Sequence, residues 1–168
     1  MNTETQKMSP LPRPWLTALP GLGGFLAIYL VSWLGELSEL SLLMAPFGAS
    51  CVLAFALPES PLAQPRNLVG GHVLSTAVGL TLLSAFGSHS WAAALGVGLA
   101  IALMQLTKTV HPPAGADPLV VLLGGGAAHT IGWSFLLTPV LLGSIVIVLV
   151  AWGFHRLNRR YAYPKQWW

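Results

Sequence analysis

The chain has 168 residues, of which 54% are hydrophobic and only 8% are charged, with a formal net charge of +3. Its mean hydropathy of +0.69 lies far above the average of soluble domains, which argues against a water-soluble fold. The pI of about 9.4 could suggest nucleic acid. However, the basic residues at 155–168 are interleaved with aromatic rings directly after an apolar stretch, which is typical of a membrane-interface anchor.

Enzymatic and metal sites are poorly represented in this sequence. Cys51 is the single cysteine, so neither a disulfide framework nor a cluster of thiol ligands can form. The five histidines have no spacing that suits a metal on one helix face. We find no phosphate-binding loop, no nucleophile elbow and no pair of carboxylates in the apolar region. We therefore expect no metal, no cofactor and no enzymatic activity.

Four long apolar stretches dominate the chain after a proline-rich beginning. Residues 1–19 are predicted to be a cytosolic lead that the mature protein keeps. The long stretches follow at about 21–40, 67–87, 91–109 and 133–156. Each approaches or exceeds the roughly 20 helical residues that cross a hydrocarbon core of ~30 Å. The sequence therefore predicts an all-α membrane protein that forms a single transmembrane domain over residues 1–168.

Two shorter apolar stretches, 42–57 and 112–123, contain prolines and glycines. Residues 46–50 (PFGAS) and 113–117 (PAGAD) share the pattern Pro-x-Gly-Ala followed by a small polar residue. A shift of 67 residues superimposes these motifs and also superimposes the long stretches. This agreement predicts two similar halves, at about 20–87 and 87–154, followed by a basic and aromatic cytosolic tail at 155–168.

The short stretches are predicted to be half-helices that begin at polar caps. Ser50 and Asp117 are good N-cap residues, and Asp117 is followed by Pro118, which favours the first helical position. Pro58 and the glycines at 124–126 end these helices early. Such broken backbone cannot face lipid, so it must be buried or line a wet cavity. We expect both helix starts to offer free N–H groups there.

The charged residues suggest a topology. If all six elements cross, with the N-terminus inside, then Arg66, Lys108 and the basic tail lie inside, whereas Glu36, Glu39 and His89 lie outside. If the short elements re-enter instead, Arg66 and Lys108 move outside. The positive-inside rule favours six crossings with both termini cytoplasmic. Each half then has three elements, so the two halves form inverted repeats.

Three motifs in this order resemble the HPP family of integral membrane proteins: residues 45–50 (APFGAS), 60–72 (SPLAQPRNLVGGH) and 108–116 (KTVHPPAGA). The resemblance covers roughly residues 20–165. It implies a small helical protein with four membrane-spanning helices, and nitrite transport is assigned to some members. We therefore expect a multi-pass protein of a bacterial inner membrane.

A small anion such as nitrite needs donors that replace its hydration in a low-dielectric passage, where desolvation costs several kcal/mol. Small residues at the helix starts would let backbone N–H groups approach it, and hydroxyl, ammonium and imidazole groups could supplement them. The predicted substrate-binding residues are Phe47, Gly48, Ala49, Ser50, Asn67, His72, Lys108, Thr109, His111, Pro113, Ala114, Gly115, Ala116 and Asp117.

Several alternatives stay open at the level of sequence. His111 could cap the helix before it, and Ser50 and Asp117 fit caps better than ligands. An anionic Asp117 would compete with an anionic solute, whereas a cation or neutral solute would make it the main candidate ligand. A membrane partner subunit that transports nothing also fits the many small residues. Because one chain offers few helices to enclose a pathway, we expect a homo-oligomer, most simply a dimer.

Overall fold

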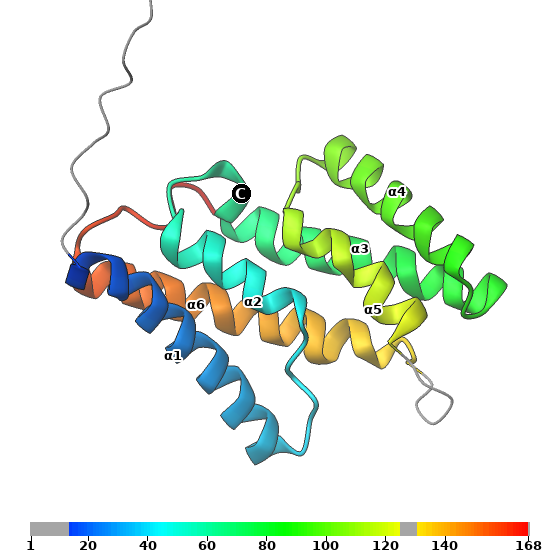
Figure 1. Cartoon of the computed structure of the whole chain (residues 1–168), viewed down its shortest axis with the longest axis horizontal. Coiled ribbons are helices and arrows are strands. Elements are labelled where there is room, and N and C mark those ends of the chain that lie inside the picture. Colours follow the sequence, from blue (N-terminus) through cyan, green and yellow to red (C-terminus); the bar gives the residue numbers. More distant parts are fainter. Residues whose placement is uncertain (1–13, 125–130, 168) are drawn as a thin grey trace, which may run out of the picture.

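The computed structural model describes residues 14–124 and 131–167, and these are folded into helices joined by short connections (Figure 1). The long apolar spans are α1 (Pro14–Ser38), α3 (Pro65–Phe86), α4 (Ser90–Thr107) and the pair η4 (Leu136–Leu141) and α6 (Leu142–Asn158). The short apolar helices are Pro46–Ala56 and Pro112–Leu123. The prediction of four long helices and two short ones is therefore confirmed.

Each short helix is a composite of two helical types. The first joins α2 (Pro46–Cys51) to the π-helical turn η1 (Val52–Ala56). The second joins the 3-10 helix η3 (Pro112–Ala116) to α5 (Asp117–Leu123), and a further 3-10 turn, η2 (Pro61–Ala63), precedes α3. Of the glycines predicted to end α5, Gly124 follows its last residue, whereas residues 125 and 126 lie outside the described residues, as does His129.

The first long helix begins earlier than predicted, at Pro14 rather than near residue 21. A proline is tolerated in the first turn because the N–H that it lacks would have no partner there. Pro20 lies further along the same helix, where its fixed φ remains compatible with helical backbone although one hydrogen bond is lost. Residues 14–19 of the predicted lead are therefore helical, and residues 1–13 lie outside the described part.

The six apolar elements run alternately in opposite directions (Figure 1). Arg66 Nη2 donates to Thr107 O at 2.7 Å, which joins the start of α3 to the end of α4. Arg160 Nη1 donates to Leu16 O at 3.3 Å, which joins the end of α6 to the start of α1. Arg66, Lys108 and the described basic residues of the tail therefore share one end of the bundle, called here the basic end. Which face of the membrane this end occupies stays a prediction, as does the repeat.

The tail is docked on the connection that leads into α3. Tyr163 is buried and its hydroxyl donates to Ala63 O at 3.0 Å. Burial raises the pKa of this phenol, so it stays a protonated donor at neutral pH. Gln64 Oε1 accepts from the Lys165 N–H at 2.8 Å. Predicted as a surface anchor, the tail thus also packs into the protein at Tyr163.

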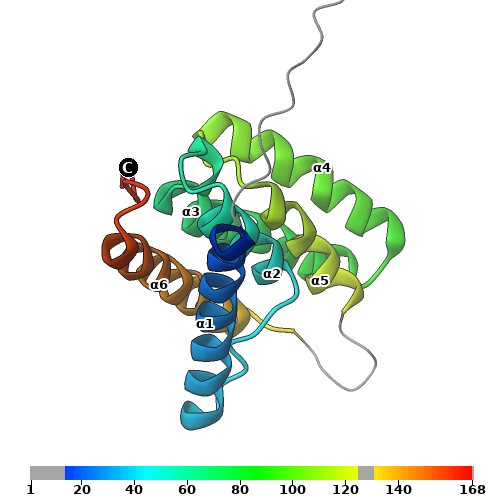
Figure 2. The ribbon, with the colours of Figure 1, turned by 60° about the vertical axis from the view of Figure 1, so that its left-hand side comes forward.

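Close approach of backbones places α5 against α3 and α4 (Figure 2). A Cβ atom at Gly79 of α3 would lie 3.1 Å from Pro118 Cα, and one at Gly96 of α4 would lie 2.9 Å from Pro118 Cβ. Small residues at helix contacts allow this proximity in membranes. The start of α5, including Asp117, is thereby held against the middle of α3.

The alternating directions predict the side of the membrane on which exposed positions are labelled. In a Cys51→Ala background, cysteines at Glu59 and Gln166 should react with a membrane-impermeant maleimide from one side, and a cysteine at His89 should react from the other. Labelling of Glu59→Cys and Gln166→Cys from opposite sides would contradict six crossings and favour re-entrant short helices.

Packing between α2 and α6 predicts a stability effect at Gly143. Its Cβ would collide with the Phe47 ring and lie 3.0 Å from Leu42 O, so Gly143→Ala should lower stability by about 1–3 kcal/mol, as overpacking does. The melting temperature in detergent checks this. Gly153→Ala on the same helix is the control, because a Cβ there meets nothing within 4 Å; an equal loss in both variants would refute the packing explanation.

Candidate functional site

Ser50 lies inside a helix and does not cap one. α2 begins at Pro46, because proline is well suited to a first helical position. The residue before it, Ala45, makes no side-chain cap. Ser50 instead points from α2 into the protein and is 0% exposed. The N–H groups of Phe47 and Gly48 already donate to Met44 O and Ala45 O, at 3.1 and 3.2 Å. The predicted cap at Ser50 is therefore wrong, because the helix starts at Pro46 and not at Ser50.

Asp117 also does not cap its helix. η3 runs directly into α5, so the residue before Asp117 is already helical, and no side chain caps this junction. Asp117 Oδ2 turns toward α3, where it lies 2.8 Å from His72 Nδ1 and accepts from Thr76 Oγ1 at 3.3 Å. The carboxyl is fully buried. Its role is tertiary, because its hydrogen bonds join α5 to α3.

Two histidines meet at the Ser50 hydroxyl. Ser50 Oγ lies 2.8 Å from His72 Nε2 and 2.8 Å from His111 Nε2. His111 Nδ1 donates to Leu62 O at 2.8 Å, so His111 does not cap α4 as the alternative interpretation held. All the side chains joined in this way are 0% exposed. We call the group the histidine cluster; its members are Ser50, His72, Thr76, His111 and Asp117.

The glycine before His72 explains how the cluster can form. A Cβ atom at Gly71 would lie 2.7 Å from His111 Cβ and 3.0 Å from Thr109 O, so only glycine lets the connection before η3 approach α3 this closely. Ser75 Oγ donates to Ala114 O at 2.6 Å and ties η3 to α3. Phe47 of α2 also contacts His72: the two rings are edge-on, and their centroids are 5.3 Å apart.

Three polar side chains among the predicted binding residues lie outside the histidine cluster. Asn67 Nδ2 donates to Val110 O at 2.8 Å, and Thr109 Oγ1 lies 2.7 Å from Thr107 Oγ1. Both fasten the connection between α4 and η3. Lys108 is exposed at the C-cap of α4, where its backbone is left-handed. The structure thus separates these residues from Ser50, His72, His111 and Asp117, which it brings together.

The small residues of the two motifs are close in sequence to the cluster but differ in exposure. Gly48 and Ala49 are exposed, Gly115 and Ala116 are half-buried, and Pro113 and Ala114 are buried. A Cβ atom at Gly48 or Gly115 would meet nothing within 4 Å. Local packing therefore does not require glycine at these two positions.

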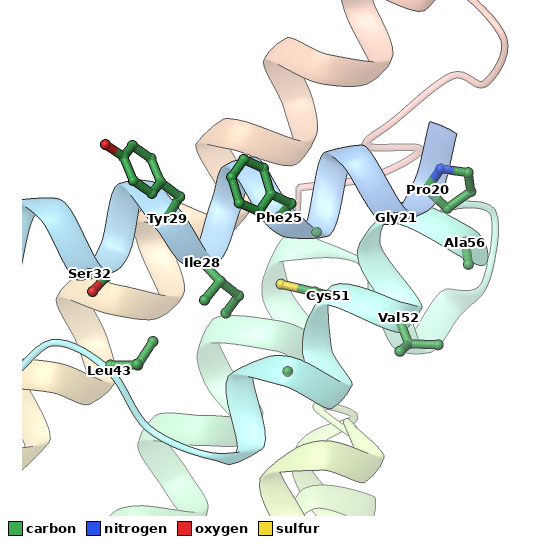
Figure 3. A pocket seen from close by; sticks show the side chains of 12 residues that line it. Pro20, Gly21, Phe25, Ile28, Tyr29, Ser32, Leu43, Cys51, Val52 and Ala56 are labelled. Carbon is green, nitrogen blue, oxygen red and sulfur yellow. The ribbon is translucent and has the colours of Figure 1, made fainter. Parts of the chain in front are cut away.

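A separate apolar cleft of about 590 Å³ lies between α1 and α2. Ile28 of α1 and Cys51 of α2 point toward one another across it (Figure 3). Ser50, the neighbour of Cys51, points instead toward α3 and η3. The cleft and the histidine cluster thus lie on different faces of α2.

Comparison with known proteins agrees with the motifs. The family model described as "HPP, transmembrane region" matches residues 9–164. The chain belongs to the HPP transmembrane family. It is 35% identical, over 179 aligned residues, to a transmembrane protein of Dictyostelium discoideum, and 40% identical over 134 residues to a second one. These alignments cover 100% and 77% of the chain, but only 61% and 43% of the two relatives. No solved structure matches the chain.

Two side chains of this HPP site were missed at the level of sequence, although their spacing carried a signal. Ser75 and Thr76 follow His72 by three and four residues in α3, so they lie on the same helix face as the histidine. Leu62 contributes only its carbonyl oxygen, for which no residue type gives a signal. Within the described residues, no group of three His, Cys, Asp or Glu side chains is placed to hold a metal ion.

Removal of the Ser50 hydroxyl predicts a loss of stability. Ser50→Ala leaves both Nε2 atoms without their partner, and an unsatisfied buried polar group costs about 1–3 kcal/mol. Ser84→Ala is the matched control, since this exposed hydroxyl bonds only to Leu80 O of its own helix. Melting temperatures of the two purified variants check the prediction, and equal values would contradict it.

Proposed function

We propose that this HPP-family chain moves a small anion across the bilayer, with nitrite as the candidate, and that the histidine cluster is the polar site on its path. One observation carries the proposal: two imidazoles, a hydroxyl and a carboxyl from α2, α3, η3 and α5 are fully buried together. Ionisable groups inside a membrane protein are expensive, and they commonly mark the pathway of a solute or ion.

The environment of Asp117 removes the main objection to an anion. A carboxylate at an open helix start would repel an anionic solute, but Oδ2 of Asp117 lies against His72 Nδ1 and Thr76 Oγ1. Its charge is thereby offset within the cluster. Ser50 and His111 can offer hydroxyl and imidazole donors in place of water. Nitrite itself is suggested by the resemblance to HPP members that are assigned this transport.

The half-buried residues Gly115 and Ala116 of η3 offer a route to the cluster. η3 contacts α2, and these two residues directly precede Asp117. Because a Cβ at Gly115 has no neighbour within 4 Å, a bulky side chain there would block the route without disturbing the core. A second copy of the chain, most simply in a dimer, would enclose this route away from lipid.

A second candidate solute is favoured by one atom. Among the described residues, Asp117 Oδ1 has no hydrogen-bond partner although it is buried. An acceptor in this state attracts a donor, which a cation or a neutral protonated solute supplies. A competition experiment separates the anion from the cation or neutral solute. Excess nitrate or formate should inhibit uptake of the transported solute only if the route accepts anions.

Uptake by purified protein in liposomes tests the proposal. We expect nitrite uptake above that of protein-free liposomes, with nitrate, chloride and formate as competitors. His111→Ala should reduce nitrite uptake because it removes an imidazole of the histidine cluster, and Gly115→Leu should reduce it because the leucine side chain obstructs the route. Gly153→Leu is the matched control, because that glycine also has open space around it but lies far along α6. If no anion is taken up, or if Gly115→Leu behaves like Gly153→Leu, the proposal fails and a partner subunit becomes the better interpretation.

A further inference from the structure

The histidine cluster is a continuous hydrogen-bonded chain. It runs from Asp117 Oδ2 to His72 Nδ1, from His72 Nε2 to Ser50 Oγ, from Ser50 Oγ to His111 Nε2, and from His111 Nδ1 to Leu62 O. All four contacts measure 2.8 Å. Each of the four contacts therefore needs one hydrogen between its two heavy atoms, so the chain needs four protons.

The end at Leu62 fixes the hydrogen on His111 Nδ1, and with a neutral His111 it also sets the direction of the other hydrogen bonds. A backbone carbonyl only accepts, so His111 Nδ1 carries a hydrogen. A neutral His111 then accepts at Nε2 and receives the single hydroxyl proton of Ser50. Ser50 has no second proton to give, so it must accept from His72 Nε2. The hydroxyl also lies 3.3 Å from Pro46 O, a longer contact that would call for still more protons on the imidazoles.

At the other end, His72 faces Asp117 with Nε2 already protonated. Either the carboxyl carries a proton and donates it to Nδ1, or the proton lies on Nδ1 and forms an imidazolium beside a carboxylate. Both forms contain the same number of protons and have no net charge. The same holds for a third form, in which His111 is the imidazolium and the two hydrogen bonds of Ser50 run the other way. A carboxylate with two neutral imidazoles would contain one proton fewer, and one hydrogen bond would be broken in a fully buried site.

We propose that the chain from Asp117 through His72, Ser50 and His111 holds one exchangeable proton and releases it at the Leu62 end. That this proton is the coupling ion of transport rests on the proposed function; the proton site itself does not. The observation behind the proposal is a run of four consecutive contacts of 2.8 Å that can all be hydrogen bonds only when this proton is present.

Release of the proton follows a balanced set of shifts. Water takes the hydrogen of His111 Nδ1, the Ser50 proton moves to His111 Nε2, the His72 Nε2 proton moves to Ser50, and the Asp117 proton moves to His72 Nδ1. One proton leaves, Asp117 becomes a carboxylate, and every hydrogen bond from Asp117 to His111 is reversed. His111 Nδ1 then faces Leu62 O with lone pair against lone pair, so this last contact opens.

The chain connects the membrane interior to the basic end. His72 lies about 10 Å along α3 from its start, at a rise of 1.5 Å per residue, whereas Leu62 is only half-buried in the connection before α3. The charged groups near that connection lie at its surface: Glu59 pairs with Lys165 of the tail at 2.9 Å, Arg66 donates to Thr107 O, and Lys108 is exposed. Cys51, the remaining titratable side chain beside Ser50, lines the cleft on the other face of α2.

The variant Asp117→Asn tests the exchangeable proton, because it removes that proton and keeps the hydrogen bonds of the chain. The asparagine Nδ2 can donate to His72 Nδ1 as the protonated carboxyl does, so the same chain forms with neutral histidines and no exchangeable proton. We expect this variant to melt at or above the temperature of the natural protein. Infrared titration in lipid should show one carboxyl or imidazolium deprotonation in the natural protein and its loss in Asp117→Asn.

Nitrogen-15 NMR of histidine-labelled protein supplies an independent signature. In the natural protein, the hydrogen of His111 should move from Nδ1 to Nε2 as the pH rises, whereas in Asp117→Asn it should stay on Nδ1. Identical titrations of both proteins, or a His111 that keeps its Nδ1 hydrogen throughout, would overturn the proposal. A destabilised Asp117→Asn would also count against it, because the network would then need the charge and not the proton.

Liposome measurements tell this proposal apart from the proposed function. With a pH-sensitive dye inside, a nitrite gradient should drive protons inward with the natural protein beyond the rate in protein-free liposomes, and Asp117→Asn should abolish this excess. Nitrite uptake without a proton titration at Asp117 would refute the proposed exchangeable proton but would still support the transport proposal. A titration that is lost in Asp117→Asn, together with no uptake of any anion, would support the proton site and end the transport proposal.

Discussion

The Ser50 hydroxyl between two imidazoles is the contact on which the rest of the site depends. One oxygen atom lies 2.8 Å from a nitrogen of α3 and 2.8 Å from a nitrogen at the start of η3. In a bilayer, such groups have no water to return to, so each must find its partner within the protein. The two short helices therefore carry their polar side chains into the bundle, and the long helices provide the apolar enclosure.

The enclosure itself was largely predictable from the sequence. Length and hydropathy identify the four spans, and prolines and glycines identify the short helices, because these signals act locally along the chain. The helix starts were less predictable: Ser50 and Asp117 have the side chains of caps, but Pro46 and Pro112 begin their helical elements earlier. Once the polar groups are inside the helices, they are free to bond across the bundle.

The composition of the site was predictable only in part. His72 and His111 are unusual in apolar surroundings and were therefore candidates, but nothing local shows that they share one hydroxyl. Convergence depends on Gly71, whose missing side chain lets the η3 connection approach α3, and on α5, which is pressed against α3 at Pro118. These are contacts between elements distant in sequence, and a single sequence contains no direct record of them.

Gln64 gives the tail an influence on the site that its position at the membrane surface does not suggest. Its Oε1 atom holds the tail through Lys165, and its Nε2 atom donates to Pro58 O and Ser60 O. Leu62, which accepts the last hydrogen bond from His111, lies within this same loop. Displacement of the tail would therefore remove one support of the loop that carries the Leu62 carbonyl, and its effect would extend to the hydrogen bond of His111.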